Sequence, residues 1–216
     1  MGNLSLITIL IIAANVALSF KGFKDYSFFE RYKFNIGAIQ RGEKIRYVTS
    51  AFLHADTSHL LFNMLTLYFF ADVVIYSLGN VHFTIIYMAS LLGGNLLSYY
   101  FHQKEYYYSA IGASGAVTGV LYAAIVLYPE MSLYLFFIPI PIPGWLFGVA
   151  YLLYSLYGMK RNTDLIGHDA HFGGAVTAYC LTLLLAPQLI VENTLTVLLL
   201  AIPIILLLVL KKLRKI

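Results

Sequence analysis

Long apolar stretches, separated by short polar or glycine- and proline-containing segments, dominate the chain from end to end. A helix needs about 20 apolar residues to cross a membrane. The pattern predicts spans over residues 3–20, 57–78, 81–101, 114–128, 143–158, 169–186 and 190–210. The fourth and fifth of these are short for a crossing, whereas the others are long enough. We see no sign of a second, soluble domain.

The composition supports helices that face lipid. Hydrophobic residues make up 60% of the chain and charged residues 11%, against roughly a quarter charged in soluble domains; the mean hydropathy is +0.79. Helices satisfy their own backbone hydrogen bonds in lipid, and the apolar runs are too long and unbroken for the alternating strands of a β-barrel. The predicted fold class is all-α, a polytopic membrane helical bundle.

The segments between the spans carry most of the charge. Residues 21–56 form a long first connection rich in Lys, Arg, Phe and Tyr, which predicts a partly helical element in the headgroup region. Residues 137–144 contain three prolines, cannot be helical throughout, and predict a turn before the fifth span. The net charge of +4 gathers in 21–46 and 211–215, which indicates contact with lipid headgroups rather than nucleic acid.

Four polar residues share one predicted depth in the membrane. Counting back from Pro129 at about 1.5 Å per residue places Ser114 roughly 22 Å up a hydrocarbon core about 30 Å thick. The same count places Asn63 at a similar height, His59 one turn above it, and His171 about 24 Å up. These residues come from three parallel spans. Polar groups inside a membrane are costly and by default mark function.

The chemistry of this layer fits acyl transfer. Ser114 opens a helix, where free backbone N–H groups and the helix dipole favour negative charge. His171, as a neutral imidazole, can take the serine proton and later return it to the leaving amine. His59 and Asn63 lie four residues apart, so they share a helix face. With the Ser114 amide they can hold an oxyanion.

Simpler interpretations of the same residues stay open. Ser114 can be only a helix N-cap, and His59 and Asn63 can anchor the first connection. A metal site built from His168 and His171 with His54 or His59 is disfavoured, because His-Glu-x-x-His and supporting carboxylates are missing. The single cysteine, Cys180, allows no internal disulfide and no cysteine-based metal site. We expect no metal and no cofactor.

Small residues and one acid complete the pattern. Gly115 and Gly119 face a second small pair, Gly174 and Ala178, so the two helices can approach closely. The pair at 93–94 indicates close packing in the third span. Asp169 lies two residues before His171 on the same predicted helix, so the two side chains do not face each other. We interpret Asp169 as an N-cap or an interfacial charge.

The chain resembles the rhomboid family of intramembrane serine proteases. The motifs that carry the resemblance are Gly112-Ala113-Ser114-Gly115, Ala170-His171-Phe172-Gly173-Gly174, His59-Leu60-Leu61-Phe62-Asn63 and the run over 46–54. The resemblance implies that Ser114 and His171 form a dyad without an acid. It also implies that His59, Asn63 and the Ser114 amide form the oxyanion hole. The implied reaction cuts membrane proteins within or near their transmembrane helices.

The resemblance covers about residues 1–187. We therefore expect a six-helix catalytic core over 1–187, with 21–56 as its interfacial first loop. An additional C-terminal transmembrane segment and a basic tail occupy 188–216. The sequence departs from the family at Thr118, where an aromatic ring often stacks on the histidine, so Thr118 itself or a tyrosine must orient His171. The first loop also lacks the family's common Trp-Arg pair.

These expectations lead to one favoured function and two alternatives. The favoured function is an endopeptidase whose substrate helices unwind beside span 143–158, with water entering through a cap formed by 159–168. The first alternative is a non-proteolytic relative that binds transmembrane helices; the intact Ser114 and His171 argue against it. The second is a channel or transporter; the lack of acidic residues at mid-depth argues against it.

Two features of the sequence predict opposite orientations of the chain in the membrane. The resemblance implies a multi-pass protein of the cell membrane whose active site opens to the extracytoplasmic side. In that orientation nearly every Lys and Arg lies outside, including the terminal run 211–215, whereas the positive-inside rule favours the reverse. We follow the resemblance.

Overall fold

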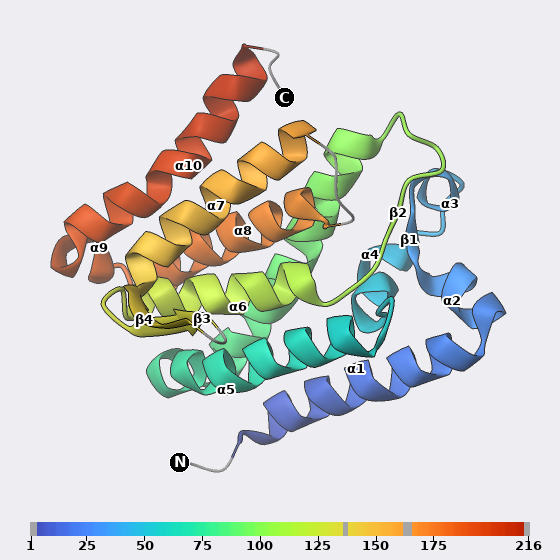
Figure 1. Cartoon of the computed structure of the whole chain (residues 1–216), viewed down its shortest axis with the longest axis horizontal. Helices are drawn as coiled ribbons and strands as arrows, with labels where there is room; N and C mark the ends of the chain where they lie inside the picture. Colours follow the sequence, from blue (N-terminus) through green and yellow to red (C-terminus); the bar gives the residue numbers. More distant parts are fainter. Residues whose placement is uncertain (1–3, 136–137, 162–165, 214–216) are drawn as a thin grey trace.

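The structure of the chain, a computed structural model, describes residues 4–135, 138–161 and 166–213 (Figure 1). Six long or central helices form a bundle: α1 Leu6–Lys24, α5 Thr57–His102, α6 Ser114–Leu127, α7 Gly144–Arg161, α8 His168–Leu185 and α10 Thr194–Lys212. Short elements connect them: α2 Tyr26–Tyr32, β1 Phe34–Asn35, α3 Ile36–Gln40, α4 Arg46–Thr49, η1 Ser50–Phe52, β2 Ser109–Ala110, β3 Ser132–Leu135, β4 Ile138–Pro143 and α9 Leu189–Glu192. The predicted membrane helical bundle is confirmed.

Helix α5 is two membrane spans joined at a glycine. Gly79 has φ 82° and ψ 166°, which breaks the helix between the predicted spans 57–78 and 81–101. The second half returns toward the first connection, since Asn95 Nδ2 donates to the Tyr47 carbonyl at 2.7 Å. A positive φ is readily adopted only by glycine. The predicted separation of these spans is therefore confirmed.

Helix α6 lies at the centre of the bundle, which explains why it can be short. It has 14 residues, and those from Gly115 to Val126 are buried. In Figure 1 it lies between α5, α7 and α8. A helix enclosed by protein does not need to match the hydrocarbon thickness, because its ends are covered by neighbouring elements rather than lipid. Three helices in the described chain, α1, α5 and α10, are long and apolar enough to cross a membrane.

Glycines bring α5, α6 and α8 into backbone contact. A Cβ on Gly174 would overlap the Gly115 carbonyl oxygen, and a Cβ on Gly119 would come within 3.1 Å of the Gly174 carbonyl. A Cβ on Gly94 would lie 2.5 Å from the Ala170 carbonyl oxygen. The predicted close packing through small residues is confirmed. Gly115 faces the Ala170 carbonyl and Gly119 the Gly174 carbonyl, so residue numbers rise together along this contact and α6 and α8 run in the same direction.

The proline-containing segment is more ordered than the predicted turn. Strand β4 pairs antiparallel with β3, in the register Ser132↔Pro143 and Leu133↔Ile142. The expectation of a simple turn over 137–144 was therefore incomplete. In a two-stranded ribbon each strand has a free edge, so prolines are tolerated where they do not need to donate. A sequence pattern of prolines excludes a helix but does not reveal this pairing.

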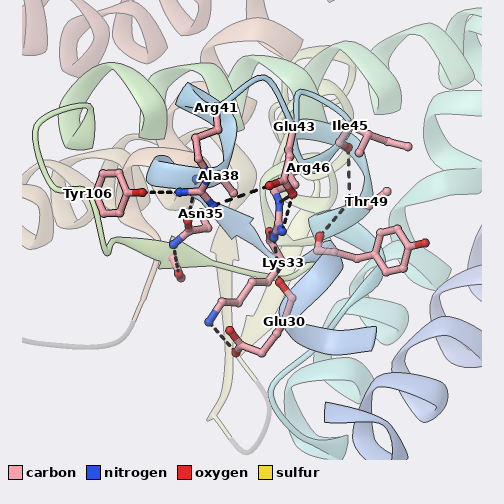
Figure 2. Close-up of polar contacts among 12 residues, drawn as sticks. Glu30, Lys33, Asn35, Ala38, Arg41, Glu43, Ile45, Arg46, Thr49 and Tyr106 are labelled. Atoms are coloured by element: carbon pink, nitrogen blue, oxygen red, sulfur yellow. Dashed lines mark hydrogen bonds and ion pairs between the residues drawn. The ribbon is translucent and has the colours of Figure 1, made fainter. Parts of the chain in front are cut away.

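A buried arginine organises the first connection (Figure 2). Arg46 forms an ion pair with Glu43 at 2.7 Å and donates to the carbonyls of Glu30 and Lys33, each at 2.8 Å. The predicted partly helical character of 21–56 is confirmed, because α2, α3, α4 and η1 lie within it.

The first connection also pairs with the chain just before Ser114. Strands β1 and β2 are antiparallel, with Phe34 opposite Ala110 and Asn35 opposite Ser109. Asn35 additionally caps α3, since its Oδ1 accepts from the Ala38 N–H at 2.9 Å. Sequence analysis missed this ribbon. Its consequence is that a distant segment of the chain fixes the approach to α6.

Helix α10 packs on α7 and α8 and runs the full depth of the bundle. The Tyr179 hydroxyl of α8 donates to the Val197 carbonyl at 2.9 Å. At its other end, Lys211 Nζ lies 3.9 Å from the ring centroid of Tyr100, near the end of α5. The short α9 precedes it, so the predicted span 190–210 begins after a break at Asn193.

Candidate active site

The predicted polar layer surrounds one cavity of about 1050 Å³. Its lining includes His59 and Asn63 from α5, Gly112 from the preceding loop, Ser114 from α6 and His171 from α8. The structure thus brings together all four side chains that the depth count placed at one level. They come from helices that run in the same direction, so equal distances from the helix ends correspond to equal depths.

Ser114 is the first residue of α6 rather than its cap. The N-cap position is Ala113, and no side chain caps this end of the helix. The interpretation of Ser114 as an N-cap is therefore wrong. Just before it, Gly112 has φ +117°, and a Cβ there would come within 2.8 Å of His59 Nε2. Only glycine allows both this backbone conformation and the close approach of the imidazole.

Histidine 54 fixes the turn before Ser114, a role that sequence analysis did not assign. His54 is fully buried and its Nδ1 lies 2.8 Å from Ser19 Oγ, whose hydroxyl donates to the Phe52 carbonyl at 3.0 Å. Because the serine proton is used there, Nδ1 must carry the imidazole proton and donate it to Ser19. Nε2 is then an acceptor, and the Ala113 N–H donates to it at 3.4 Å.

The environment of His54 keeps it neutral. Burial, followed by the neighbouring His59, lowers the pKa of His54 from 6.5 to about 3, against a smaller opposing effect of Asp56. A protonated imidazole would lose its acceptor and with it the bond from Ala113. The only signal in the sequence was the spacing of His54 five residues before His59, which does not show what either ring contacts.

Acidification should destabilise the fold through His54. Below about pH 6.5 the unfolded chain binds a proton at this residue that the folded chain does not, so the free energy of unfolding falls as the pH decreases. The expected slope is on the order of 1 kcal/mol per pH unit. Thermal unfolding in detergent between pH 7 and pH 5 measures it. A slope in His54→Gln as steep as in the native protein would contradict the assignment.

Asn63 and His59 are placed by the start of α5. Asp56 caps this helix, accepting from the His59 N–H at 2.8 Å, and puts His59 in the first turn. Asn63 follows one turn later and is buried, with 7% of its surface exposed. Within the described part of the chain its Nδ2 has no hydrogen-bond partner. Asn63 also lines the cavity, so this donor is available to a group bound there.

His171 is held by a tyrosine from α7. The Tyr151 hydroxyl lies 2.9 Å from His171 Nδ1, and the two rings are nearly parallel, at 23° with centroids 6.2 Å apart. The sequence indicated Thr118 or some tyrosine as the partner. It did not select Tyr151 from the several tyrosines of span 143–158.

Asp169 faces away from His171, as expected, but it is not a helix N-cap. The cap of α8 is Gly167, and Asp169 lies in the first turn. Its Oδ2 is 3.4 Å from His102 Nε2, and the His102 ring stacks on Tyr108 with centroids 3.6 Å apart. The acid therefore belongs to a cluster with His102 and Tyr108 that also lines the cavity.

These features define a multi-pass helical membrane protein whose polar side chains gather around one cavity at one end of the bundle. Comparison with known families gives the particular group. The model of the Rhomboid domain family matches residues 41–188. The chain belongs to this family.

Several curated proteins are similar to the chain. RHOMBOID-like protein 12, mitochondrial, of Arabidopsis thaliana is 29% identical over 78% of this chain and 55% of its own length. Rhomboid protein 1, mitochondrial, of Saccharomyces cerevisiae is 32% identical over 62% of this chain and 39% of its own length. A Bacillus subtilis protein provisionally named rhomboid protease YdcA is 35% identical over 44% of this chain and 47% of its own length. The chain thus spans about two fifths to just over half of these relatives.

Proposed function

We propose that the protein is an intramembrane serine endopeptidase that cuts other membrane proteins within or near their transmembrane helices. Ser114 is the nucleophile and His171 the general base. His59, Asn63 and the Ser114 backbone amide form the oxyanion hole. The observation that carries this proposal is the shared cavity, in which a serine, a histidine and an unpaired amide donor from three helices line one space.

The reaction follows from these roles. His171 Nε2 takes the Ser114 proton as Oγ attacks the scissile carbonyl, and the imidazolium then protonates the leaving amine. The carbonyl oxygen becomes an oxyanion near the uncapped start of α6, where the backbone N–H groups and helix dipole favour negative charge. Water, activated by the same imidazole, then hydrolyses the acyl-enzyme. This cycle uses no carboxylate, consistent with the pairing of Asp169 with His102.

The substrate is a transmembrane helix that opens locally beside α7. Helix α7 contacts the core through polar bonds such as that from the Tyr122 hydroxyl to the Gly148 carbonyl. A separated strand of the substrate can then reach Ser114. The predicted water entry through 159–168 includes residues 162–165, which lie outside the described part of the structure.

A labelling and cleavage experiment tests the proposal. The purified protein in detergent is incubated with a fluorophosphonate probe and with a panel of single-span fluorescent peptides, with Ser114→Ala as the matched control. We expect Ser114 to be labelled and at least one peptide to be cut, and neither in the variant. Stable binding of peptides without labelling or cleavage would instead support the alternative, a non-proteolytic protein that binds transmembrane helices.

The orientation requires its own test. We propose that the cavity opens to the extracytoplasmic side of the cell membrane, against the positive-inside rule. Single cysteines are introduced at Lys104, near the cavity, and at Glu130, beyond the far end of α6, in a Cys180→Ser background. An impermeant maleimide added to intact bacteria should label position 104 and spare position 130. The reverse pattern would place the cavity in the cytoplasm.

A further inference from the structure

We propose that Tyr151 of α7 is the positioning residue of the base, occupying on a different helix the place that an acid holds in a Ser-His-Asp triad. The inference rests on the proposed function, because it assigns a role within the same site. It also means that the orientation of His171 depends on α7, the helix beside which the substrate enters.

The geometry fixes the Tyr151 hydroxyl against the imidazole. Besides its 2.9 Å contact with His171 Nδ1, the Tyr151 ring stacks on Phe147 at 14°, with centroids 5.7 Å apart. Phe147 lies one turn earlier on α7 and restricts the rotation of the tyrosine ring. The hydroxyl therefore approaches the imidazole from a side chain that is itself packed.

The required role of His171 determines which atom donates and which accepts in its contact with Tyr151. Nε2 of His171 must be unprotonated to take the Ser114 proton, so the neutral ring carries its proton on Nδ1. That N–H donates to Tyr151 Oη, whose oxygen lone pairs accept it. Tyr151 thus selects the reactive tautomer and holds the ring in one orientation.

The acceptor also acts when the imidazole becomes charged. During attack His171 becomes an imidazolium, and a hydrogen bond from a charged donor is stronger than one from a neutral donor. A tyrosine oxygen stabilises this charge less than a carboxylate would, but it can be buried without the desolvation cost of an ion. A neutral acceptor therefore suits a base that lies within the membrane.

The test compares Tyr151→Phe with Tyr157→Phe, a matched control at a residue of the same helix that is 57% exposed. Removing the Tyr151 hydroxyl should lower kcat about 10- to 100-fold, the effect of losing one hydrogen bond to a charged group. KM should change little, and fluorophosphonate labelling of Ser114 should slow by a similar factor, because it needs the same base. Tyr157→Phe should leave all three values unchanged.

Each result decides the inference. Unchanged kcat and labelling in Tyr151→Phe, with an active native protein, would overturn it and leave the proposed function standing. A raised KM with a lowered thermal midpoint and unchanged kcat would show a merely structural role. A native protein that is neither labelled nor active would remove the proposed function itself.

Discussion

Replacing either Ser114 or His171 by alanine should lower kcat by about 10⁴- to 10⁶-fold, and the double variant should be no worse than the single ones. The two residues act as a unit, since a hydroxyl without a base is a poor nucleophile and a base without a hydroxyl has nothing to activate. Residual turnover would come from binding and from the oxyanion donors alone. Quantitative mass spectrometry of a cleaved single-span peptide measures this range.

Asp169→Asn is the control for a dyad rather than a triad. Its carboxylate faces His102 at 3.4 Å and not His171, so the substitution should change kcat by less than about threefold. A loss comparable to that of His171→Ala would instead show that an acid supports the base. Thermal midpoints must be measured for all variants, because loss of the fold would imitate loss of the dyad. Cleavage that persists in His171→Ala would refute the dyad directly.

The sequence predicted the depth of the site because helix geometry is regular. A constant rise per residue turns sequence separation into height, so Ser114, Asn63 and His171 could be placed at one level before any contact was known. The apolar pattern is interrupted at Gly79 and between residues 127 and 144, and these interruptions predicted where the spans end. The packing of Gly115 against Gly174 was predictable for a similar reason, since small residues one turn apart mark a close helix contact.

The partners of these residues could not be predicted, because they depend on tertiary contacts that leave no periodic signal. The hydrogen bond from the Ala113 amide to His54 Nε2 joins segments 59 residues apart. The sequence could not show which tyrosine of span 143–158 contacts His171, since it contains several, and the structure identifies Tyr151. The β1–β2 ribbon consists of two residue pairs that lie far apart in the sequence. In each case the sequence supplied the chemistry of one partner, and only the fold selected the other.

Replacing Asn63 should affect activity but not stability, because its side-chain amide has no protein partner in the described chain. Its buried Nδ2 has no protein partner in the described chain and lines the cavity, so removing it breaks no hydrogen bond of the fold. A donor placed in this way can act on charge that develops only during the reaction. Asn63→Ala should therefore lower kcat by about 10²- to 10³-fold without lowering the thermal midpoint.

Asn95→Ala is the matched control, because Asn95 lies on the same helix α5 but its amide is paired, donating to the Tyr47 carbonyl at 2.7 Å and to Ser50 Oγ at 3.3 Å. Removing it leaves buried acceptors without a donor and should destabilise the fold by about 1–3 kcal/mol. Its effect on kcat should be much smaller than that of Asn63→Ala. If Asn63→Ala destabilised the fold as much as Asn95→Ala and kept its activity, Asn63 would be an anchor of the first connection and the oxyanion hole would lack this donor.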